Sequence, residues 1–343
     1  MSEWPCHSRA VRLAAHPEGL PRPEHFEIVS VPLAAPAAGE VLVRNRYFRV
    51  AASLRMMIAK GAAEIEGVPL PALRPGDALA DEALGEIVAA PPGSGLACGD
   101  WVLHPFGWRE YAAIPADACV RVGDVLPSRT AHLGHGATAY AALTRGVRIL
   151  PGDTVFITSA AGAVGSMAGQ IARLLGAARV IGSTGSIAKA NRLTSELGYD
   201  AVVVRGERPL AEQLREVAPE GLDVVIDTVG GEQLQIAIGA ARNHARVLVL
   251  GALSGQLAAS GSGRVAPVEL DSFQLLLKKI TIRGYSADDD PDALAEWLVC
   301  LGGWLRTGDI RFPHVVIDGL DAALGAIQGV AEGRYFGTVL VGL

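Results

Sequence analysis

The chain has 343 residues, of which 50% are hydrophobic and 19% charged, with a net charge of −6. This composition excludes long disorder, and the lack of basic runs excludes a nucleic-acid-binding surface. No apolar stretch reaches the roughly 18 residues that span a bilayer, and residues 1–10 lack the apolar core of a signal peptide. We therefore expect a cytoplasmic protein that binds neither nucleic acid nor membranes.

The first ~125 residues predict a β-rich domain. Short strand-like runs alternate with Pro/Gly turns such as Arg74-Pro75-Gly76-Asp77, a spacing typical of a closed or strongly bent β-domain. The predicted strands are Glu40–Val43, Glu86–Ala89, Trp101–His104 and Tyr111–Ile114.

From about Leu150 strands and helices alternate. The strand-like runs are continuous and apolar, as in parallel strands that helices cover on both faces. The predicted strands are 154–158, 179–184, 201–204, 223–227 and 246–250, and the predicted helices are 164–175, 187–197, 211–217 and one from Glu232. This alternation predicts an α/β fold with a doubly wound parallel sheet. The last ~35 residues (Phe312–Leu343) return to a strand, a helix and a strand.

Cysteines and histidines give no pattern of a metal site. A structural zinc site needs clustered thiolates, and disulfide frameworks belong to short secreted chains. His132 and His135 lie three residues apart, with no carboxylate or cysteine nearby in sequence. We predict no metal and buried free thiols at the four scattered cysteines, Cys6, Cys98, Cys119 and Cys300.

The segment Ser159–Gly165 follows the first strand of the α/β region and has the Ala-x-Gly-x-x-Gly form of a dinucleotide-binding loop. Gly162 lets the backbone approach a pyrophosphate, and Gly165 lets the next helix pack close to the strand. Free N–H groups and the helix dipole then face the anion. A purely structural turn is the alternative. The predicted contacts are Ala161, Gly162, Ala163, Val164 and Gly165.

The end of the next predicted strand indicates NADPH rather than NADH. NAD-specific sites place an acid about 20 residues after the loop, whereas residues 182–186 read Gly-Ser-Thr-Gly-Ser. Lys189 and Arg192 on the following helix, and Arg205 after the next strand, supply cations that suit a 2′-phosphate. A solvated helix face is the alternative for Lys189 and Arg192. The predicted phosphate contacts are Thr184, Ser186, Lys189 and Arg205.

Several motifs resemble those of the medium-chain dehydrogenase/reductase superfamily: Gly39–Arg44, Gly136–Tyr140, Ala160–Gly169 and Asp227–Glu232. Within it, the chain is similar to the zinc-independent leukotriene B4 dehydrogenase, prostaglandin reductase and curcumin reductase group. The resemblance implies a GroES-like catalytic domain (1–126), a Rossmann NADPH-binding domain (127–308) and a C-terminal segment (309–343) that rejoins the catalytic domain. The active site is expected in the cleft between the domains, and a homodimer is expected.

The resemblance also implies a reaction and further cofactor contacts. The expected substrate is a small molecule with a conjugated carbonyl, which takes hydride from NADPH at its β-carbon and a proton at its α-carbon. The positions that match the family's cofactor contacts are Thr138, Tyr140, Thr228, Gly251, Ala252, Leu253 and Tyr335.

The chain departs from the family at the substrate end. Where the family commonly reads Asp-Pro-Tyr-Met-Arg, residues 51–55 read Ala-Ala-Ser-Leu-Arg, so Ser53 replaces a cleft tyrosine. Gln256 replaces a second one. These changes predict a substrate bulkier or more polar than a simple alkenal. The candidate catalytic residues are Tyr285, Ser53 and Arg55, and packing against the nicotinamide ring is the alternative for Tyr285.

Two other functions remain open at this stage. A quinone or carbonyl reductase of the same superfamily would keep the same cofactor site. A non-catalytic NADPH-binding protein is also compatible with the loss of both cleft tyrosines.

Overall fold

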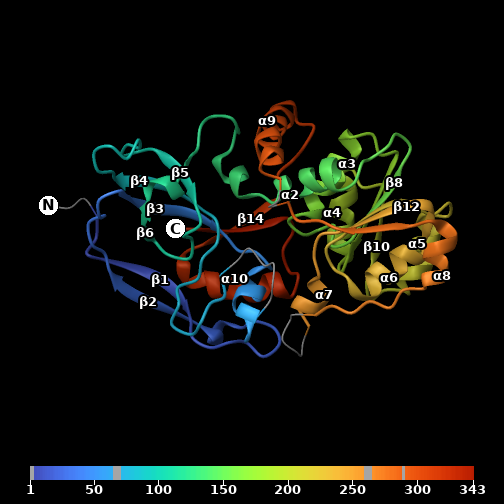
Figure 1. Ribbon diagram of the computed structural model, residues 1–343, viewed down its shortest axis with the longest axis horizontal. Coiled ribbons are helices and arrows are strands. Elements are labelled where there is room, and N and C mark those ends of the chain that lie inside the picture. The colour runs from blue at the N-terminus through green and yellow to red at the C-terminus, as the bar shows by residue number, and fades with distance from the viewer. Residues whose placement is uncertain (1–3, 65–70, 259–264, 288–289) are drawn as a thin grey trace.

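The computed structural model describes residues 4–64, 71–258, 265–287 and 290–343, which form two lobes side by side (Figure 1). The first lobe is a β-rich body built from both ends of the chain. The second is a layered α/β body built from its middle. Within these ranges no helix is long and apolar enough to cross a membrane.

The second lobe contains a six-stranded parallel sheet in the order β10-β9-β8-β11-β12-β13. The chain moves outward from β8 to β10 and returns to β11 on the other side of β8, so the strand order reverses between β8 and β11. The strands are β8 (Thr154–Ile157), β9 (Arg179–Thr184), β10 (Ala201–Val204), β11 (Leu222–Asp227), β12 (Ala241–Val249) and β13 (Thr281–Gly284).

Helices cover both faces of this sheet. Side chains point alternately to one face and the other along each strand, so each strand contributes to a hydrophobic core on both sides. In β8, Val155 and Ile157 join one hydrophobic core, and Phe156 joins the core on the opposite face. The helices of this lobe are α3 (Gly165–Leu174), α4 (Ile187–Leu197), α5 (Leu210–Val217), α6 (Gly231–Gly239), α7 (Leu253–Gln256) and α8 (Ser272–Lys278).

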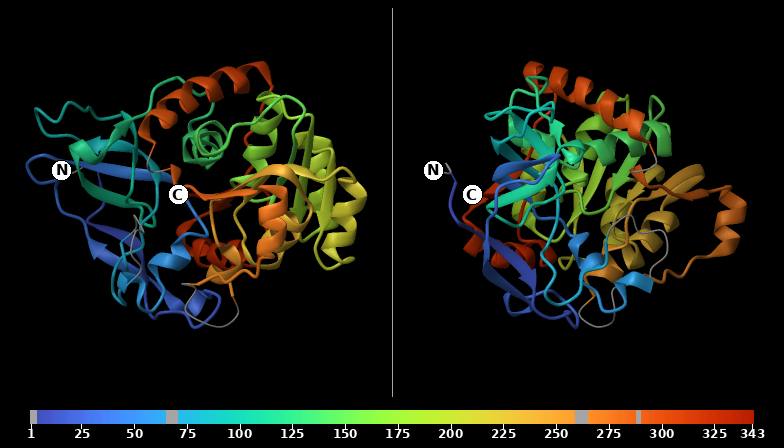
Figure 2. Two further views of the ribbon diagram at one scale, coloured as in Figure 1. Left: turned by 45° about the vertical axis from the view of Figure 1, so that its right-hand side comes forward. Right: turned by 60° about the vertical axis from the view of Figure 1, so that its left-hand side comes forward.

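Two more helices lie where the lobes meet. Helix α2 (Gly136–Ala141) continues into a π-helical turn, η5 (Ala142–Gly146), and packs beneath α9 (Pro291–Thr307), the orange-red helix at the top of both views in Figure 2. A Cβ at Gly136 would lie 2.1 Å from the Trp297 ring, so glycine allows this close packing.

The first lobe joins strands from both ends of the chain. Its seven-stranded sheet has the order β14-β15-β3-β4-β5-β7, with β6 also paired to β3. The sheet consists of β3 (Glu40–Arg49), β4 (Ala83–Ala89), β5 (Trp101–His104), β6 (Tyr111–Pro115), β7 (Val120–Arg121), β14 (His314–Asp318) and β15 (Thr338–Gly342). Strands β1 (His7–Leu13) and β2 (Phe26–Pro32) form a separate antiparallel pair.

Helices complete this lobe. Helix α10 (Leu320–Ala331) connects β14 to β15 and buries Leu320, Ala323 and Ile327 in the first-lobe core. The short helices are α1 (Leu54–Met57), η1 (Pro23–His25), η2 (Ala62–Glu64), η3 (Ala116–Ala118) and η4 (Arg129–Leu133).

The predicted fold class is confirmed, with differences that have local causes. Strand β3 runs six residues beyond the predicted Val43, because Arg44 to Arg49 interrupt the apolar run but remain paired in the sheet. Strand β12 begins at Ala241 and bulges opposite β11, with His244 in a left-handed conformation (φ 64°).

The four cysteines are free, but the prediction that they are buried is wrong. Cys6 and Cys98 are exposed, and Cys119 and Cys300 are half-buried. Cys6 precedes β1 and Cys98 lies in the connection between β4 and β5, where no layer covers either side chain. Cysteines are usually buried because they usually lie in hydrophobic cores. Cys6 and Cys98 lie outside the hydrophobic cores of this protein.

Candidate active site

The loop between β8 and α3 has the geometry of an anion-binding turn. Ser159 has a left-handed backbone (φ 51°), and the Gly162 N–H donates to the Ser159 carbonyl over 2.9 Å. A Cβ at Gly165 would lie 2.5 Å from that carbonyl oxygen, so glycine lets α3 start this close to the strand. Ser166, Met167 and Ala168 donate their N–H groups to the carbonyls of Gly162 and Val164. Among the described residues the N–H groups of 163–165 make no backbone hydrogen bond, and such groups bind phosphate in loops of this kind.

The loops after β11 and β12 are joined to each other at the same edge of the sheet. Leu253 and Ser254 donate their N–H groups to the carbonyls of Thr228 and Val229, over 3.1 and 2.8 Å. A Cβ at Gly251 would lie 3.0 Å from the Thr228 carbonyl oxygen. Doubly wound folds bind ligands at this carboxyl edge, where the strand order reverses. The structure thus brings the predicted cofactor positions in these two loops together with the phosphate loop.

Asp227, to which the sequence analysis assigned no role, fixes this edge. Its buried carboxylate accepts hydrogen bonds from Thr158 Oγ1 (2.8 Å) and from the N–H groups of Gly230 (2.7 Å) and Val229 (3.3 Å). Burial raises the pKa of Asp227, and these hydrogen bonds oppose part of that rise. An acid directly after an apolar strand was the signal that could have identified it.

Lys189 and Arg205 lie together at the end of β9, near Ser186. A Cβ at Gly185 would lie 3.1 Å from Arg205 Nη2, so the guanidinium lies over that glycine. Burial, and then the Arg205 charge, lower the pKa of Lys189, whose Nζ donates to the Gly333 carbonyl. The Ser186 side chain caps no N–H of α4. Two neighbouring cations and a hydroxyl at a strand end without an acid fit the 2′-phosphate of NADPH.

Two nearby residues, Arg192 and Tyr335, have side chains that contact other parts of the protein. Arg192 makes two hydrogen bonds to Glu196 (2.7 and 2.9 Å), and its guanidinium carbon lies 4.0 Å from the centre of the Phe336 ring. The Tyr335 ring packs against α10, where a Cβ at Gly329 would lie 2.4 Å from it. Arg192 therefore belongs to the helix surface, and a cofactor contact by Tyr335 remains a prediction.

Tyr140 faces α9 rather than the loops of the sheet edge. Its ring centre lies 5.7 Å from that of Trp297 and 6.4 Å from that of Trp304, and its hydroxyl lies 3.4 Å from Glu296. Burial is the main reason that the pKa of Tyr140 rises to about 12. Thr138, on the same helix, is half-buried. Contacts of both residues with the nicotinamide remain predictions.

The Tyr285 hydroxyl also makes a hydrogen bond within the protein. It donates to Asp290, the residue that precedes α9, while the Tyr285 N–H donates to the Val249 carbonyl over 3.1 Å. Burial, and then Asp290, raise the pKa of Tyr285 to about 12. A direct catalytic role for Tyr285 therefore requires this hydrogen bond to open.

Helix α1 bridges the two lobes at the substrate end. Met56 Sδ lies 3.1 Å from Nε2 of Gln256, the residue that replaces a family tyrosine. Ser53 precedes α1 and is half-buried. Arg55 is 3% exposed, and its Nε and Nη1 atoms find no hydrogen-bond partner among the described residues. Burial lowers the pKa of Arg55. The structure thus gathers Ser53, Arg55 and Gln256 on and beside one short helix, with Tyr285 elsewhere.

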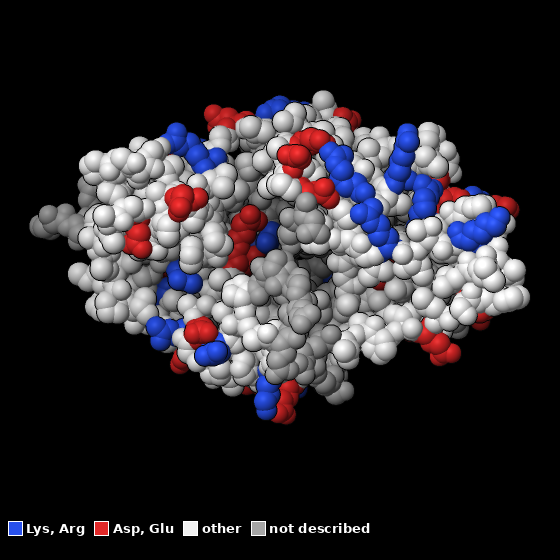
Figure 3. Space-filling view, in the orientation of Figure 1, with Lys and Arg blue, Asp and Glu red and all other residues white. Residues whose placement is uncertain are grey.

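A charged cluster that the sequence analysis missed lies at the adjacent end of β3. Arg49 bonds Asp81 through Nε (3.1 Å) and Nη2 (2.9 Å), and Glu82 through Nη1 (2.9 Å). Burial is the main reason that the pKa of Glu82 is raised. Asp81-Glu82 directly before a strand was the available signal. Figure 3 shows acidic side chains and a basic one within the hollow between the lobes.

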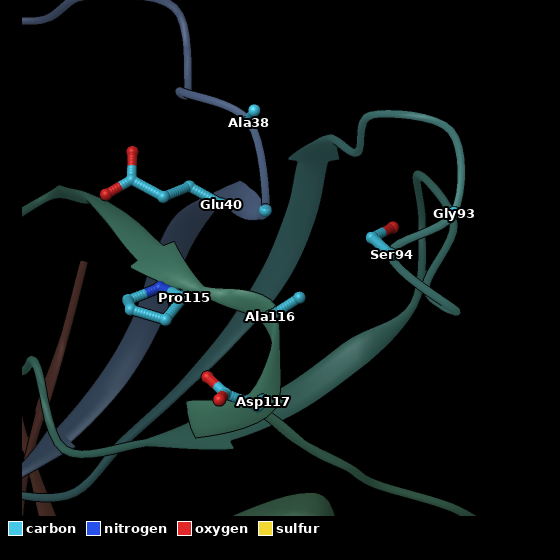
Figure 4. Close-up of a pocket in the computed structure, with 8 residues that line it drawn as sticks. Ala38, Glu40, Gly93, Ser94, Pro115, Ala116 and Asp117 are labelled. Atoms are coloured by element: carbon cyan, nitrogen blue, oxygen red, sulfur yellow. The ribbon is translucent and has the colours of Figure 1, made fainter.

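Another hollow, of about 510 Å³, lies on the first lobe alone (Figure 4). Glu40, Ser94 and Asp117 are among the residues that line it. The Glu40 carboxylate accepts the Ala37 N–H over 3.0 Å and so closes a turn. None of the cofactor loops contributes to this hollow, so it is separate from the candidate site.

Two family models match the chain. The model described as the N-terminal domain of oxidoreductase matches residues 9–137, and the one described as zinc-binding dehydrogenase matches residues 163–299. Bovine prostaglandin reductase 1 is 31% identical over 98% of this chain and 99% of its own length. The chain belongs to the zinc-independent group of the medium-chain dehydrogenase/reductase superfamily. Among the described residues, no group of three or more His, Cys, Asp or Glu side chains could hold a metal ion.

Other relatives name the cofactor. NADPH-dependent curcumin reductase of Escherichia coli is 29% identical over 96% of this chain and 95% of its own length. The crystal structure of CurA from Vibrio vulnificus in complex with NADPH superposes with a TM-score of 0.86 at 29% identity, covering 97% of this chain and 98% of that one. The predictions of the family, of an NADP-dependent oxidoreductase and of NADPH as its cofactor are confirmed.

Proposed function

We propose that this protein uses NADPH to reduce the conjugated C=C bond of an α,β-unsaturated ketone or aldehyde. The observation that carries the proposal is the loop Ser159–Gly165, which lies at the sheet edge facing the first lobe and is joined there to the last strand through Gly337. A nucleotide on that loop would extend along the junction of the lobes. Several relatives are named as a curcumin reductase, a prostaglandin reductase or a 2-alkenal reductase, and one of Leishmania amazonensis is named as a probable quinone oxidoreductase.

The chain's own residues account for binding the cofactor. The N–H groups of residues 163–165, where the loop meets α3, bind the pyrophosphate, and Lys189 and Arg205 bind the 2′-phosphate. Thr228 and the loop from Gly251 to Leu253 orient the nicotinamide end. When bound, NADPH supplies the hydride that the β-carbon receives.

Ser53 and Arg55 are our candidates for holding the substrate. The Arg55 guanidinium is buried without a hydrogen-bond partner among the described residues, and a buried unpaired charge is costly unless a ligand compensates it. A conjugated carbonyl oxygen beside it would be polarised for reduction. Tyr285 is the third candidate, and it acts only once its hydroxyl leaves Asp290.

One observation favours a second function, a non-catalytic NADPH-binding protein. Ser53 and Gln256 stand where the family has cleft tyrosines, Gln256 contacts Met56, and the Tyr285 hydroxyl is bonded to Asp290. The first function would then lack a free phenol at these three positions. A quinone or carbonyl reductase would use the same cofactor loops.

NADPH oxidation on a panel of enones, enals, quinones and saturated ketones separates these functions. We expect turnover on bulky or polar enones, with saturated ketones inert and the C=C bond reduced in the isolated product. Turnover of quinones alone would replace the proposal by the quinone reductase. Tight NADPH binding with no turnover on any member would replace it by the binding protein.

We further propose a homodimer, the domain bounds 1–126, 127–308 and 309–343, and a cytoplasmic location. The dimer is supported by one of the two edges of the parallel sheet, where β13 pairs only with β12 within the part of the chain that the structure describes. On β13 and on the preceding helix α8 several apolar side chains are exposed: Phe273, Leu276, Leu277 and Ile282. Open strand edges next to apolar surface are typical of sheets that continue into a partner.

A further inference from the structure

A second hollow of the first lobe, of about 520 Å³, borders the one in Figure 4 and shares Glu40 with it. Alternate residues of β1 line this hollow, namely Ser8, Ala10 and Arg12, because every second side chain of a strand points to the same face. The neighbours of β1 complete the lining, with the end of β2 on one side and the segment around Arg109 on the other. The hollow therefore lies among elements that the sheet contacts hold in place.

Arg109 presents to this hollow a guanidinium that the backbone holds in position. Its Nε donates to the Gly107 carbonyl over 3.2 Å, and its Nη2 donates to the Leu79 carbonyl over 3.0 Å. Its Nη1 makes no hydrogen bond with the described residues and is not sealed from solvent, so it remains accessible to a ligand. Burial lowers the pKa of Arg109, and no carboxylate among the described residues forms an ion pair with it. A partly buried charge of this kind is stabilised by a bound anion.

Arg12 adds a second cation to the same hollow. It is half-buried and forms no ion pair within the part of the chain that the structure describes, although Glu27 is its partner in the register of β1 with β2. Glu40 is the single acid among the lining residues, and its carboxylate accepts the Ala37 N–H over 3.0 Å. Two guanidinium groups and one carboxylate leave one net positive charge. Most of the remaining lining is small and apolar, as in Ala10, Val31, Pro32, Ala34, Ala78 and Ala113.

We propose that this hollow binds an organic monoanion, a carboxylate with a short apolar tail. Arg12 and the accessible Nη1 of Arg109 bind the carboxylate, a group whose geometry the guanidinium matches. The alanine-rich walls contact the tail, and the single net positive charge of the lining balances one negative charge. A volume of about 520 Å³ is typical of small-molecule sites. Neither the cofactor loops nor α1 contribute to the lining, so this site is independent of the proposed reductase function.

Calorimetric titration of the full-length protein, saturated with NADPH, tests the proposal with octanoate as the probe. Butyrate shortens the tail, octylamine reverses the charge of the head, and octyl phosphate replaces the carboxylate. Arg12→Gln removes one guanidinium, and Ala113→Leu fills part of the apolar wall without changing charge. Arg215→Gln is the matched control, because Arg215 is an exposed arginine on α5, in the other lobe. The Tm of each variant shows whether its fold is intact, and either hollow variant suffices if the other is unstable.

We expect one octanoate per chain, with affinity lowered at least about tenfold by Arg12→Gln and unchanged by Arg215→Gln. Ala113→Leu should also weaken octanoate, and each CH2 removed from the tail should weaken binding by up to about fourfold. Octylamine should not bind, and octanoate should leave the KM for enones unchanged.

Several results would overturn the proposal and leave the reductase function standing. They are no binding of octanoate, equal binding of octylamine, or parent-like octanoate affinity in the two hollow variants. Tighter binding of octyl phosphate would show a phosphate site instead of a carboxylate site. Octanoate that competes with the enone, with equal affinity in all variants, would place the carboxylate in the cleft between the lobes.

Discussion

Gly337 donates its backbone N–H to the Ala161 carbonyl over 2.9 Å, so the residue before the last strand lies directly on the phosphate loop. The backbone of Gly337 has φ 81°, and a Cβ there would lie 2.0 Å from the Pro313 carbonyl oxygen. This contact ties the C-terminal segment, and through β15 the first lobe, to the place where the pyrophosphate is expected to bind.

Gly337→Ala should therefore destabilise the fold and weaken NADPH binding together. The added methyl group meets backbone and forces an unfavourable φ, which should cost about 2–3 kcal/mol. Urea unfolding and NADPH titration measure the two effects. Gly303→Ala in α9 is the control, since a Cβ there meets nothing within 4 Å and a helical alanine is favoured. Equal behaviour of the two variants would contradict the role given to Gly337.

Lys189→Ala should raise the KM for NADPH by one to two orders of magnitude and leave the KM for NADH nearly unchanged. Its ammonium lies beside Arg205, so removing it takes away half of the charge that a 2′-phosphate meets. Arg192→Ala is the control, because that guanidinium is already bonded to Glu196 and stacked on Phe336. A loss shared equally by NADPH and NADH would show that Lys189 supports the loop rather than the phosphate.

Leu276→Asp should convert the proposed dimer to a monomer. Leu276 is 70% exposed beside the free edge of β13, and a charge there would have to be buried in an interface. Light scattering should show a species near 35.6 kDa for this variant and about twice that for the parent. Val299→Asp changes an equally exposed valine on α9 and should leave the mass unaltered. A monomeric parent protein would end the dimer proposal.

Stability should fall as the pH is lowered from about 6.5 towards 3, and His104 should account for part of the loss. Burial, and then Arg109, lower the pKa of His104 to about 3. The unfolded chain binds a proton at higher pH than the folded one, so stability is complete above the unfolded pKa and decreases below it. Each such histidine contributes up to about 1.4 kcal/mol per pH unit.

His104→Asn should flatten this dependence. An asparagine oxygen can accept the Phe106 N–H that now bonds His104 Nδ1 at 3.2 Å. Urea unfolding at pH 7, 6 and 5 gives the slopes, and His314→Asn at an exposed position is the control. Identical slopes for the parent and His104→Asn would mean that other buried groups, such as His132 and His135, carry the whole effect.

The second lobe, which carries the cofactor loops, was easier to predict because its strands and helices follow from patterns of neighbouring residues. Buried parallel strands form continuous apolar runs, and β9, α4 and β10 begin and end at the predicted residues. The Lys189–Arg205 pair followed from the start of α4 and the end of β10, which a doubly wound sheet places at the same edge. The strands of the first lobe mix polar and apolar residues. The predicted strand at 40–43 therefore covers only the first part of β3, and β1 and β2 were not predicted.

The substrate end was less predictable, because its contacts join distant parts of the chain. The Met56–Gln256 contact and the ion pairs of Arg49 with Asp81 and Glu82 depend on how the two lobes meet. The sequence indicated a helix start near Asp290 but not how α9 packs, and that packing determines where Tyr140 and Tyr285 direct their hydroxyls. A motif fixes a residue's place in the sequence but not its hydrogen-bond partner.

The position of β15 has a consequence for how this chain is synthesised. Strand β3 is made about 290 residues before β15, yet the two pair, and the Leu343 N–H bonds the Arg46 carbonyl at 2.9 Å. The strands of the parallel sheet are contiguous in the chain and can assemble while translation continues. Residues 47–49 of β3 stay unpaired until β15 has been made, so truncations that remove β15 should yield a folded cofactor lobe attached to an unfinished, aggregation-prone sheet.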